Sequence, residues 1–124
     1  MRWVDQLVRC DDTGATVTAC PHEAAWSVHD GRVLETALVE CLAQAVAAAA
    51  GHRARQRDPA SQEGPAAGML VAVSGFRVLQ RPRADETLRI EVRELRRLGP
   101  MLQVAGTIYR GDQEIAAGEL TLHV

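Results

Sequence analysis

The feature that most constrains this chain is an alanine-rich stretch from Val33 to Ala50, which contains neither proline nor glycine. Alanine has the highest helix propensity of all residues, and the stretch is much longer than a usual buried strand. Gly51 follows it, and glycine is common just past the end of a helix. We therefore predict one long helix over about Val33–Ala50. Because its side chains are apolar nearly all round, we expect protein to enclose it.

The sequence on both sides of this helix has the patterns of β-strands. Thr87–Arg93 alternates strictly between apolar and polar residues, which is typical of a half-buried strand. The other predicted strands, separated by turn-forming residues, are Trp3–Val8, Ala15–Ala19, Met69–Val73, Phe76–Leu79, Met101–Tyr109 and Glu114–Leu122. The segments 21–31 and 53–68 are predicted to be loops.

An antiparallel sheet that curls round a single apolar helix would satisfy both patterns. The helix would hide its surface, and the strands would keep their polar residues on the outer face. This is the α+β hot-dog fold, and we expect residues 1–124 to form one such domain. A sheet of this kind leaves edge strands open, so we also expect the chain to form a dimer.

Composition and charge exclude several classes of partner. The formal net charge of -2 argues against general nucleic-acid binding, which needs a basic surplus. The longest apolar stretch, Ala37–Ala50, is too short for a membrane span. The three cysteines, Cys10, Cys20 and Cys41, are an odd number without a C-x-x-C pair. They fit free thiols in a reducing cytoplasm, where we expect the protein to reside.

Glu40 and Gln44 are the residues of the predicted helix that most suggest chemistry. A carboxylate in an apolar helix is costly to bury unless it is paired or protonated through a raised pKa. Gln44 lies one turn later on the same face, within reach as a partner. His29, in the loop that enters the helix, could form a base and acid pair with Glu40. His22 is a weaker candidate for the base, and Glu40 and Gln44 could instead face solvent at a gap in the sheet.

Several motifs together resemble those of bacterial β-hydroxyacyl-ACP dehydratases. Glu40–Ala45 resembles the Glu-x-x-Ala-Gln helix motif of that family, in which the acidic residue is catalytic. Glu23–His29 resembles the loop that ends in the catalytic histidine, and Met69–Val124 resembles the C-terminal half. Gly31–Val33 before the helix, with Glu40 and Gln44 inside it, is closer to a divergent subgroup. This subgroup resembles the dehydratase-like proteins of aryl-polyene and related polyketide-type gene clusters.

The resemblance implies a function and a set of site residues. It implies a hydro-lyase that removes water from a β-hydroxyacyl thioester, as in fatty acid biosynthesis, to form a trans-2-enoyl product. His29 and Glu40 would be catalytic and would meet across a dimer interface, and Gln44 would orient the carboxyl group or a water. The backbone near Leu34 and Thr36 would bind the thioester carbonyl. The substrate would arrive on the phosphopantetheine of an acyl carrier protein or of CoA, and the family needs no metal or redox cofactor.

Two departures from the family pattern keep other functions open. The spacing from His29 to Glu40 is shorter than usual, and Leu34-Glu35-Thr36 stands near the position of the family's Pro-Gly pair. One alternative is a thioesterase of the same fold, in which Glu40 would activate water. The other is a non-catalytic acyl-binding protein or a heterodimer partner of a related subunit. The sequence does not specify the acyl chain length, the pathway, or a preference between carrier protein and CoA.

Overall fold

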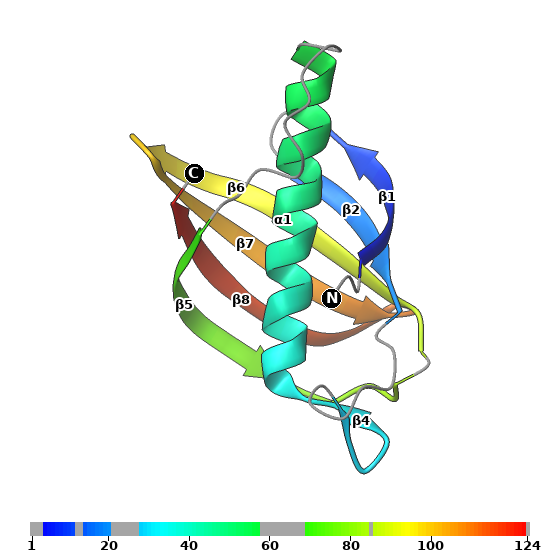
Figure 1. The fold of residues 1–124 in the computed structure, drawn as a ribbon. Coiled ribbons are helices and arrows are strands. Elements are labelled where there is room, and N and C mark those ends of the chain that lie inside the picture. The colour runs from blue at the N-terminus through cyan, green and yellow to red at the C-terminus, as the bar shows by residue number, and fades with distance from the viewer. Residues whose placement is uncertain (1–3, 12–13, 21–27, 58–68, 85, 124) are drawn as a thin grey trace.

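A long helix lies in the hollow of a curled antiparallel sheet (Figure 1). The computed structural model describes residues 4–11, 14–20, 28–57, 69–84 and 86–123. The elements follow the order β1 (Val4–Cys10), β2 (Gly14–Ala19), β3 (Val28–His29), β4 (Arg32–Val33), α1 (Glu35–Arg57), β5 (Met69–Val78), β6 (Leu88–Leu98), β7 (Met101–Arg110) and β8 (Gln113–His123). Six strands form the main sheet in the order β1-β2-β6-β7-β8-β5, and β3 pairs with β4 in a separate hairpin. This arrangement confirms the predicted α+β fold.

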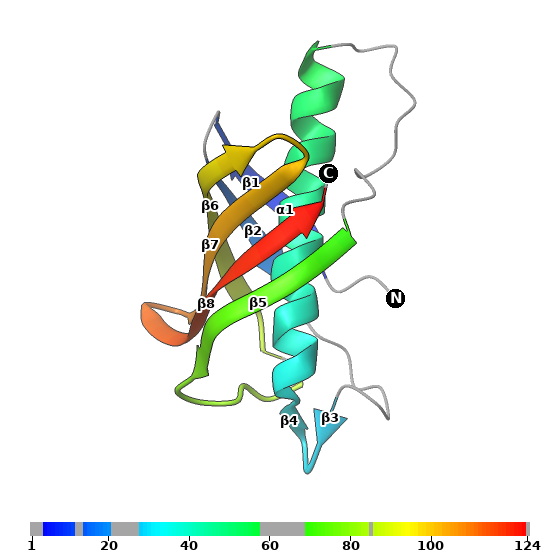
Figure 2. The same cartoon turned by 90° about the vertical axis from the view of Figure 1, so that its left-hand side faces the viewer.

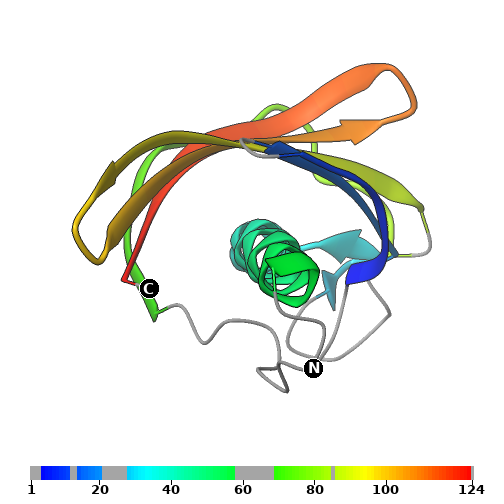
Figure 3. The same cartoon turned by 90° about the horizontal axis from the view of Figure 1, so that it is seen from above.

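The alternation of apolar and polar residues places one face of the sheet against α1. On β6, Leu88, Ile90 and Val92 are buried, whereas the residues between them are half-buried. Ile90 pairs with Ile108 of β7, which is also fully buried, so the apolar rows continue across neighbouring strands. The core therefore lies between the concave face of the sheet and the helix (Figure 3).

Two glycines permit close packing, one on β7 against the helix and one on β8 against β5. A Cβ atom added at Gly106 would lie 2.7 Å from Cδ2 of Leu42, which is fully buried. On β8, a Cβ atom added at Gly118 would lie 2.9 Å from the Cα atom of Phe76 on β5. Each glycine thus permits a contact that any larger residue would obstruct.

The predicted end of the helix at Gly51 is wrong, because α1 continues through Gly51 to Arg57. A glycine inside a helix costs about 1 kcal/mol relative to alanine, and this is not enough to stop a helix that good helix formers continue. Residues 53–57, predicted to be part of a loop, are helical for this reason. The rest of that predicted loop, 58–68, lies outside the described residues.

Two of the predicted strands are a single strand in the structure. The sequence pattern separates Met69–Val73 from Phe76–Leu79, whereas β5 runs from Met69 to Val78. The pairing of β5 with β8 shifts register between Ser74 and Arg77, where Gly75 has a φ of 60°. A β-bulge of this kind bends a strand without ending it.

Only one side of α1 is covered by the chain's own sheet. Its buried side chains recur at the spacing of one helix face: Ala37, Leu38, Cys41, Leu42, Ala45, Val46 and Ala49. The opposite face includes exposed Glu40 and half-buried Ala43 and Gln44. The apolar composition predicted full enclosure, but a single curled sheet can cover only the face towards which it curls. Among the described residues, no helix has the length and hydropathy that a bilayer span requires.

Candidate active site

His29 lies on a tight hairpin next to the start of the helix (Figure 2). β3 and β4 are joined by Asp30 and Gly31, whose φ angles of 53° and 73° are both positive. Two successive positive φ angles are typical of the type I′ turn that connects two-residue hairpins. The side chain of His29 is 73% exposed, and its Nε2 lies 3.4 Å from Oδ2 of Asp30. The hairpin therefore presents an accessible imidazole beside the helix entrance.

The helix begins directly after this hairpin. The carbonyl oxygen of Leu34 accepts hydrogen bonds from the amides of Ala37, at 3.1 Å, and Leu38, at 3.2 Å. The N–H groups that precede them, at Glu35 and Thr36, have no acceptor one turn earlier, as at every helix start. Thr36 is exposed and Leu34 is half-buried. The two residues predicted to bind the thioester carbonyl thus lie at the first turn, beside the hairpin of His29.

Glu40 and Gln44 form a polar pair on the open face of α1. The Nε2 atom of Gln44 donates a hydrogen bond of 3.3 Å to Oε1 of Glu40. This contact was expected from their spacing of one helical turn. Glu40 is exposed because it lies on the helix face away from the sheet. The sequence left this exposure to solvent open as an alternative. The carboxyl group is therefore accessible to a substrate or to a second subunit.

The single chain does not join all the predicted site residues. Among the described residues, Asp30 forms an ion pair with the His29 side chain and Arg81 donates a hydrogen bond to its carbonyl oxygen, and no hydrogen bond or ion pair joins His29 to Glu40. His29 stands at the entrance of the helix, and Glu40 lies in its second turn. His22, the weaker candidate for the base, lies outside the described residues. The polar contacts within one chain therefore do not bring His29 and Glu40 together as a catalytic pair.

Sequence reasoning missed the part that Arg81 plays next to this site. Arg81 follows β5, and its side chain donates hydrogen bonds to the carbonyl oxygens of His29, Arg32 and Val33. The sequence offers only a weak signal for this, an arginine before Pro82 that is outside any strand pattern. A contact between residues this far apart in the chain appears only in the fold.

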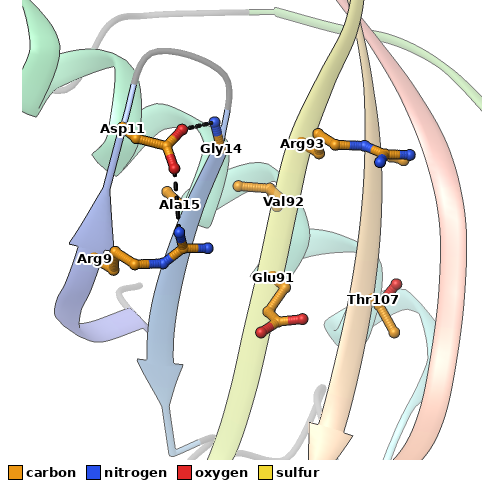
Figure 4. Close-up of a pocket in the computed structure, with 9 residues that line it drawn as sticks. Arg9, Asp11, Gly14, Ala15, Glu91, Val92, Arg93 and Thr107 are labelled. Carbon is orange, nitrogen blue, oxygen red and sulfur yellow. Dashed lines mark hydrogen bonds and ion pairs between the residues drawn. The ribbon is translucent and has the colours of Figure 1, made fainter.

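A separate hollow of about 300 Å³ lies on the outer face of the sheet (Figure 4). Glu91 and Thr107 line it, and they alternate along their strands with buried residues that face α1. Its charged groups are partly paired, since Arg9 Nη1 lies 3.2 Å from Asp11 Oδ2. This hollow is on the face of the sheet opposite to Glu40. Within the described part of the chain, no group of three or more His, Cys, Asp or Glu residues could hold a metal ion.

Solved structures with the same fold are numerous and distant in sequence. The dehydratase heterocomplex ApeI:P from Xenorhabdus doucetiae matches with a TM-score of 0.83 and 18% identity, over 98% of this chain and 82% of that chain. A thioesterase-like protein related to phenylacetic acid degradation, from Ralstonia eutropha, matches with a TM-score of 0.65 and 18% identity, over 90% and 76%. A Streptococcus mutans protein bound to acetyl CoA matches with a TM-score of 0.67 and 17% identity, over 98% and 87%. These likenesses confirm the hot-dog fold.

The sequence itself connects the chain to one family. No curated protein sequence matches it. The ApeP-like family, described as ApeP dehydratase, matches over residues 1–124. This agrees with the resemblance carried by the helix motif around Glu40 and by the segment that ends at His29, and it supports an enzyme of the hydro-lyase type. The chain belongs to the ApeP-like dehydratase family.

Proposed function

We propose that this protein removes water from a β-hydroxyacyl thioester and forms a trans-2-enoyl thioester. The substrate would be carried on the phosphopantetheine arm of an acyl carrier protein, with CoA as the alternative carrier. The observation that carries the proposal is the match to the ApeP-like dehydratase family over residues 1–124. Glu40 lies in a segment that resembles the Glu-x-x-Ala-Gln motif of β-hydroxyacyl-ACP dehydratases, and this supports its assignment as the acid. The accessibility of Glu40 and its hydrogen bond from Gln44 support it.

The chemistry assigns a proton transfer to each of two side chains. Neutral His29 would take the proton from Cα, next to the thioester carbonyl, and the electron pair of that bond would form the C=C bond. The β C–O bond would break, and Glu40 would give its proton to the departing hydroxyl, which leaves as water. The proton on His29 would return to Glu40 through solvent. These transfers balance without a metal or a redox cofactor.

The start of α1 would stabilise the charge that develops on the thioester oxygen. The amide N–H groups at Glu35 and Thr36 have no acceptor within the helix, and the helix dipole favours negative charge at this end. Donors aimed at a developing oxyanion are among the largest contributions to enzymatic rate enhancement. Leu34 and Thr36 would therefore border the thioester carbonyl, while Gln44 would hold the carboxyl group of Glu40 in place.

The catalytic pair would form between two subunits. His29 and Glu40 do not touch within the described chain, and both are exposed, so each can meet a group from a partner. Covering the open face of α1 with a second subunit would also exclude water from Glu40. We expect a homodimer, and a heterodimer with a related hot-dog subunit is the alternative. The ApeI:P neighbour is a dehydratase heterocomplex, and this supports the heterodimer as the alternative.

Mass spectrometry of a β-hydroxyacyl carrier protein incubated with the enzyme tests the proposal. We expect loss of one water from the acyl group with the wild-type protein. His29→Ala and Glu40→Gln should each lower the rate by about 10²-fold or more, the usual contribution of a general acid or base. Glu114→Gln is the control, because Glu114 is also an exposed carboxylate but lies on β8 and not on α1. It should keep the wild-type rate within about twofold.

Other outcomes of the same experiment would identify the alternatives. Release of the free acid from the carrier would identify a thioesterase, a function favoured by the thioesterase-like neighbour from Ralstonia eutropha. An unchanged substrate, both for the protein alone and for a complex with a related subunit, would contradict a dehydratase. Activity only in the complex would assign the chain to a heterodimer.

A further inference from the structure

The hairpin that carries His29 is too small to fix its own orientation. β3 and β4 contribute two residues each to a sheet separate from the main one, and Arg32 of β4 also forms an isolated antiparallel bridge with Arg83. An isolated two-stranded hairpin is at best marginally stable in water. The direction of the His29 imidazole therefore depends on what holds this hairpin to the rest of the molecule.

One side chain, that of Arg81, reaches along the hairpin from the β5–β6 connection. Its Nε donates to the carbonyl oxygen of Val33 at 2.9 Å, and its Nη2 donates to those of Arg32, at 3.1 Å, and His29, at 3.4 Å. A guanidinium has five N–H donors in a rigid planar fork, so one arginine can hold several fixed carbonyl groups at once. These bonds connect directly to the backbone of the proposed base.

Further hydrogen bonds join the same two segments. The amide of Val33 donates to the carbonyl oxygen of Pro82 at 2.8 Å, and the amide of Ala84 donates to that of Gly31 at 3.1 Å. In return, Nη1 of Arg32 donates to the carbonyl oxygen of Arg81 at 3.2 Å. These bonds attach β4 and the turn of the hairpin to the connection between β5 and β6, whereas the bond from Arg81 to His29 reaches β3.

The β5–β6 connection is in turn tied to the main sheet. On β7, Nε of Arg110 lies 3.4 Å from Oε2 of Glu86, and both side chains are half-buried, at 26% and 27% exposure. The other oxygen of Glu86 accepts a hydrogen bond of 3.1 Å from the amide of Arg83. Arg81 therefore acts from a support that the sheet itself holds in place.

We propose that Arg81 is a positioning residue for the dehydration, which sets the orientation of His29 by holding the β3–β4 hairpin against the entrance of α1. The proposal rests on the function proposed above for His29. Arg81 does not touch the reacting atoms, because its donors are directed at backbone carbonyl groups of the hairpin. Lysine could replace only part of this, since its single nitrogen cannot form the same fork.

Two measurements on the full-length protein test the proposal, with Arg81→Ala, Arg81→Lys and, as the control, Arg83→Ala. Arg83 lies two residues away and is exposed, and no described contact involves its guanidinium. The first measurement is amide hydrogen exchange by NMR. Arg81→Ala should speed exchange at Val33 and Ala84 by about tenfold, because local opening of the hairpin becomes easier. Exchange of the β6–β7 amides should stay within about twofold of wild type, and Arg81→Lys should be intermediate.

The second measurement is steady-state kinetics with a β-hydroxyacyl N-acetylcysteamine thioester, which needs no carrier protein. Arg81→Ala should lower kcat by about tenfold or more with little change in KM, because a misplaced base affects the transition state more than binding. Arg81→Lys should restore part of the loss, and Arg83→Ala should behave as wild type.

Three results would overturn the proposal. They are unchanged exchange at Val33 and Ala84 in Arg81→Ala, an equal increase throughout the sheet, and faster local exchange with an unchanged kcat. A wild-type protein that does not dehydrate any thioester would instead refute the proposed function. The exchange measurement would then decide by itself whether Arg81 holds the hairpin.

Discussion

The hydrogen bond from Gln44 to Glu40 favours one orientation of the Glu40 carboxyl group. An exposed glutamate has several rotamers of similar energy, and a donor one turn away favours the one in which the two side chains meet. In a dehydration, only the rotamer that faces the β-hydroxyl would transfer a proton. The amide of Gln44 thus reduces the number of orientations that the acid must search.

We predict that Gln44→Met lowers kcat for a β-hydroxyacyl thioester by about tenfold and leaves KM nearly unchanged. Methionine has a similar volume but cannot donate a hydrogen bond, so the change removes the contact without leaving a cavity. Steady-state kinetics would measure the effect. Stability to urea should change little, because the pair is exposed or half-buried. A Gln44→Met protein with wild-type kcat would show that Gln44 does not orient the acid.

At the scale of the elements, a glycine on β8 determines how the edge strand β5 packs on the sheet. Within the described part of the sheet, β5 pairs with β8, and Phe76 of β5 lies directly against Gly118 of β8. Part of this contact is with the Cα atom of Phe76, so a side-chain rotation cannot relieve it. Gly118 therefore sets how closely β5 packs on the sheet.

We predict that Gly118→Ala destabilises the protein by about 1–3 kcal/mol, the usual cost of inserting a methyl group into a tightly packed site. Urea unfolding monitored by circular dichroism would measure the loss. Ala117→Ser is the control, because Ala117 is the half-buried neighbour of Gly118 on the same strand. Equal stability of the Gly118→Ala and wild-type proteins would mean that β5 can move away from β8 at no cost.

The sequence was informative about elements with a regular pattern and much less so about irregular ones. The strict alternation of Thr87–Arg93 identified β6, because one face of that strand is buried and the other is not. By contrast, β3 was predicted as part of a loop, since its residues are too few to show a period. Val33 was predicted as the start of the helix, whereas it lies in β4 and α1 begins at Glu35. The end of α1 at Arg57 was missed because propensity is a weak signal at a single glycine.

The candidate site was only partly predictable for a related reason. Glu40 and Gln44 are one turn apart on one helix, so their contact followed from helix geometry. The attachment of His29 to Arg81 spans two distant segments, and no local rule places them together. We expect His29 to meet Glu40 across two subunits, and the pattern of one chain does not specify such a contact.

At the scale of the whole molecule, β5 is the edge through which we expect two subunits to pair. Its residues from Leu70 to Gly75 are all exposed, including the large aliphatic side chains Leu70, Val71 and Val73. A long exposed edge with such side chains is a template for strand pairing, and natural proteins usually cover it. Pairing there would extend the sheet from one subunit into the next.

We predict that Val71→Lys converts a dimer into a monomer, because a charge on the edge opposes strand pairing. Sedimentation velocity would measure the change, and dehydratase activity should fall with it if the catalytic pair spans two subunits. Val8→Lys is the matched control, since Val8 lies on β1 at the other edge and is 58% exposed, against 52% for Val71. A Val71→Lys protein that remains dimeric would place the interface elsewhere.

The contact between Leu42 and Gly106 bears on the direction in which the carboxyl group of Glu40 points. Successive residues of an α-helix are about 100° apart, so Glu40 lies about 200° around the axis from Leu42. Because Gly106 has no side chain, Leu42 packs directly against β7, and with this face of α1 turned to the sheet the carboxyl group of Glu40 points away from it. A larger residue at Gly106 would displace the side chain of Leu42 and so press on α1 from the face opposite to Glu40.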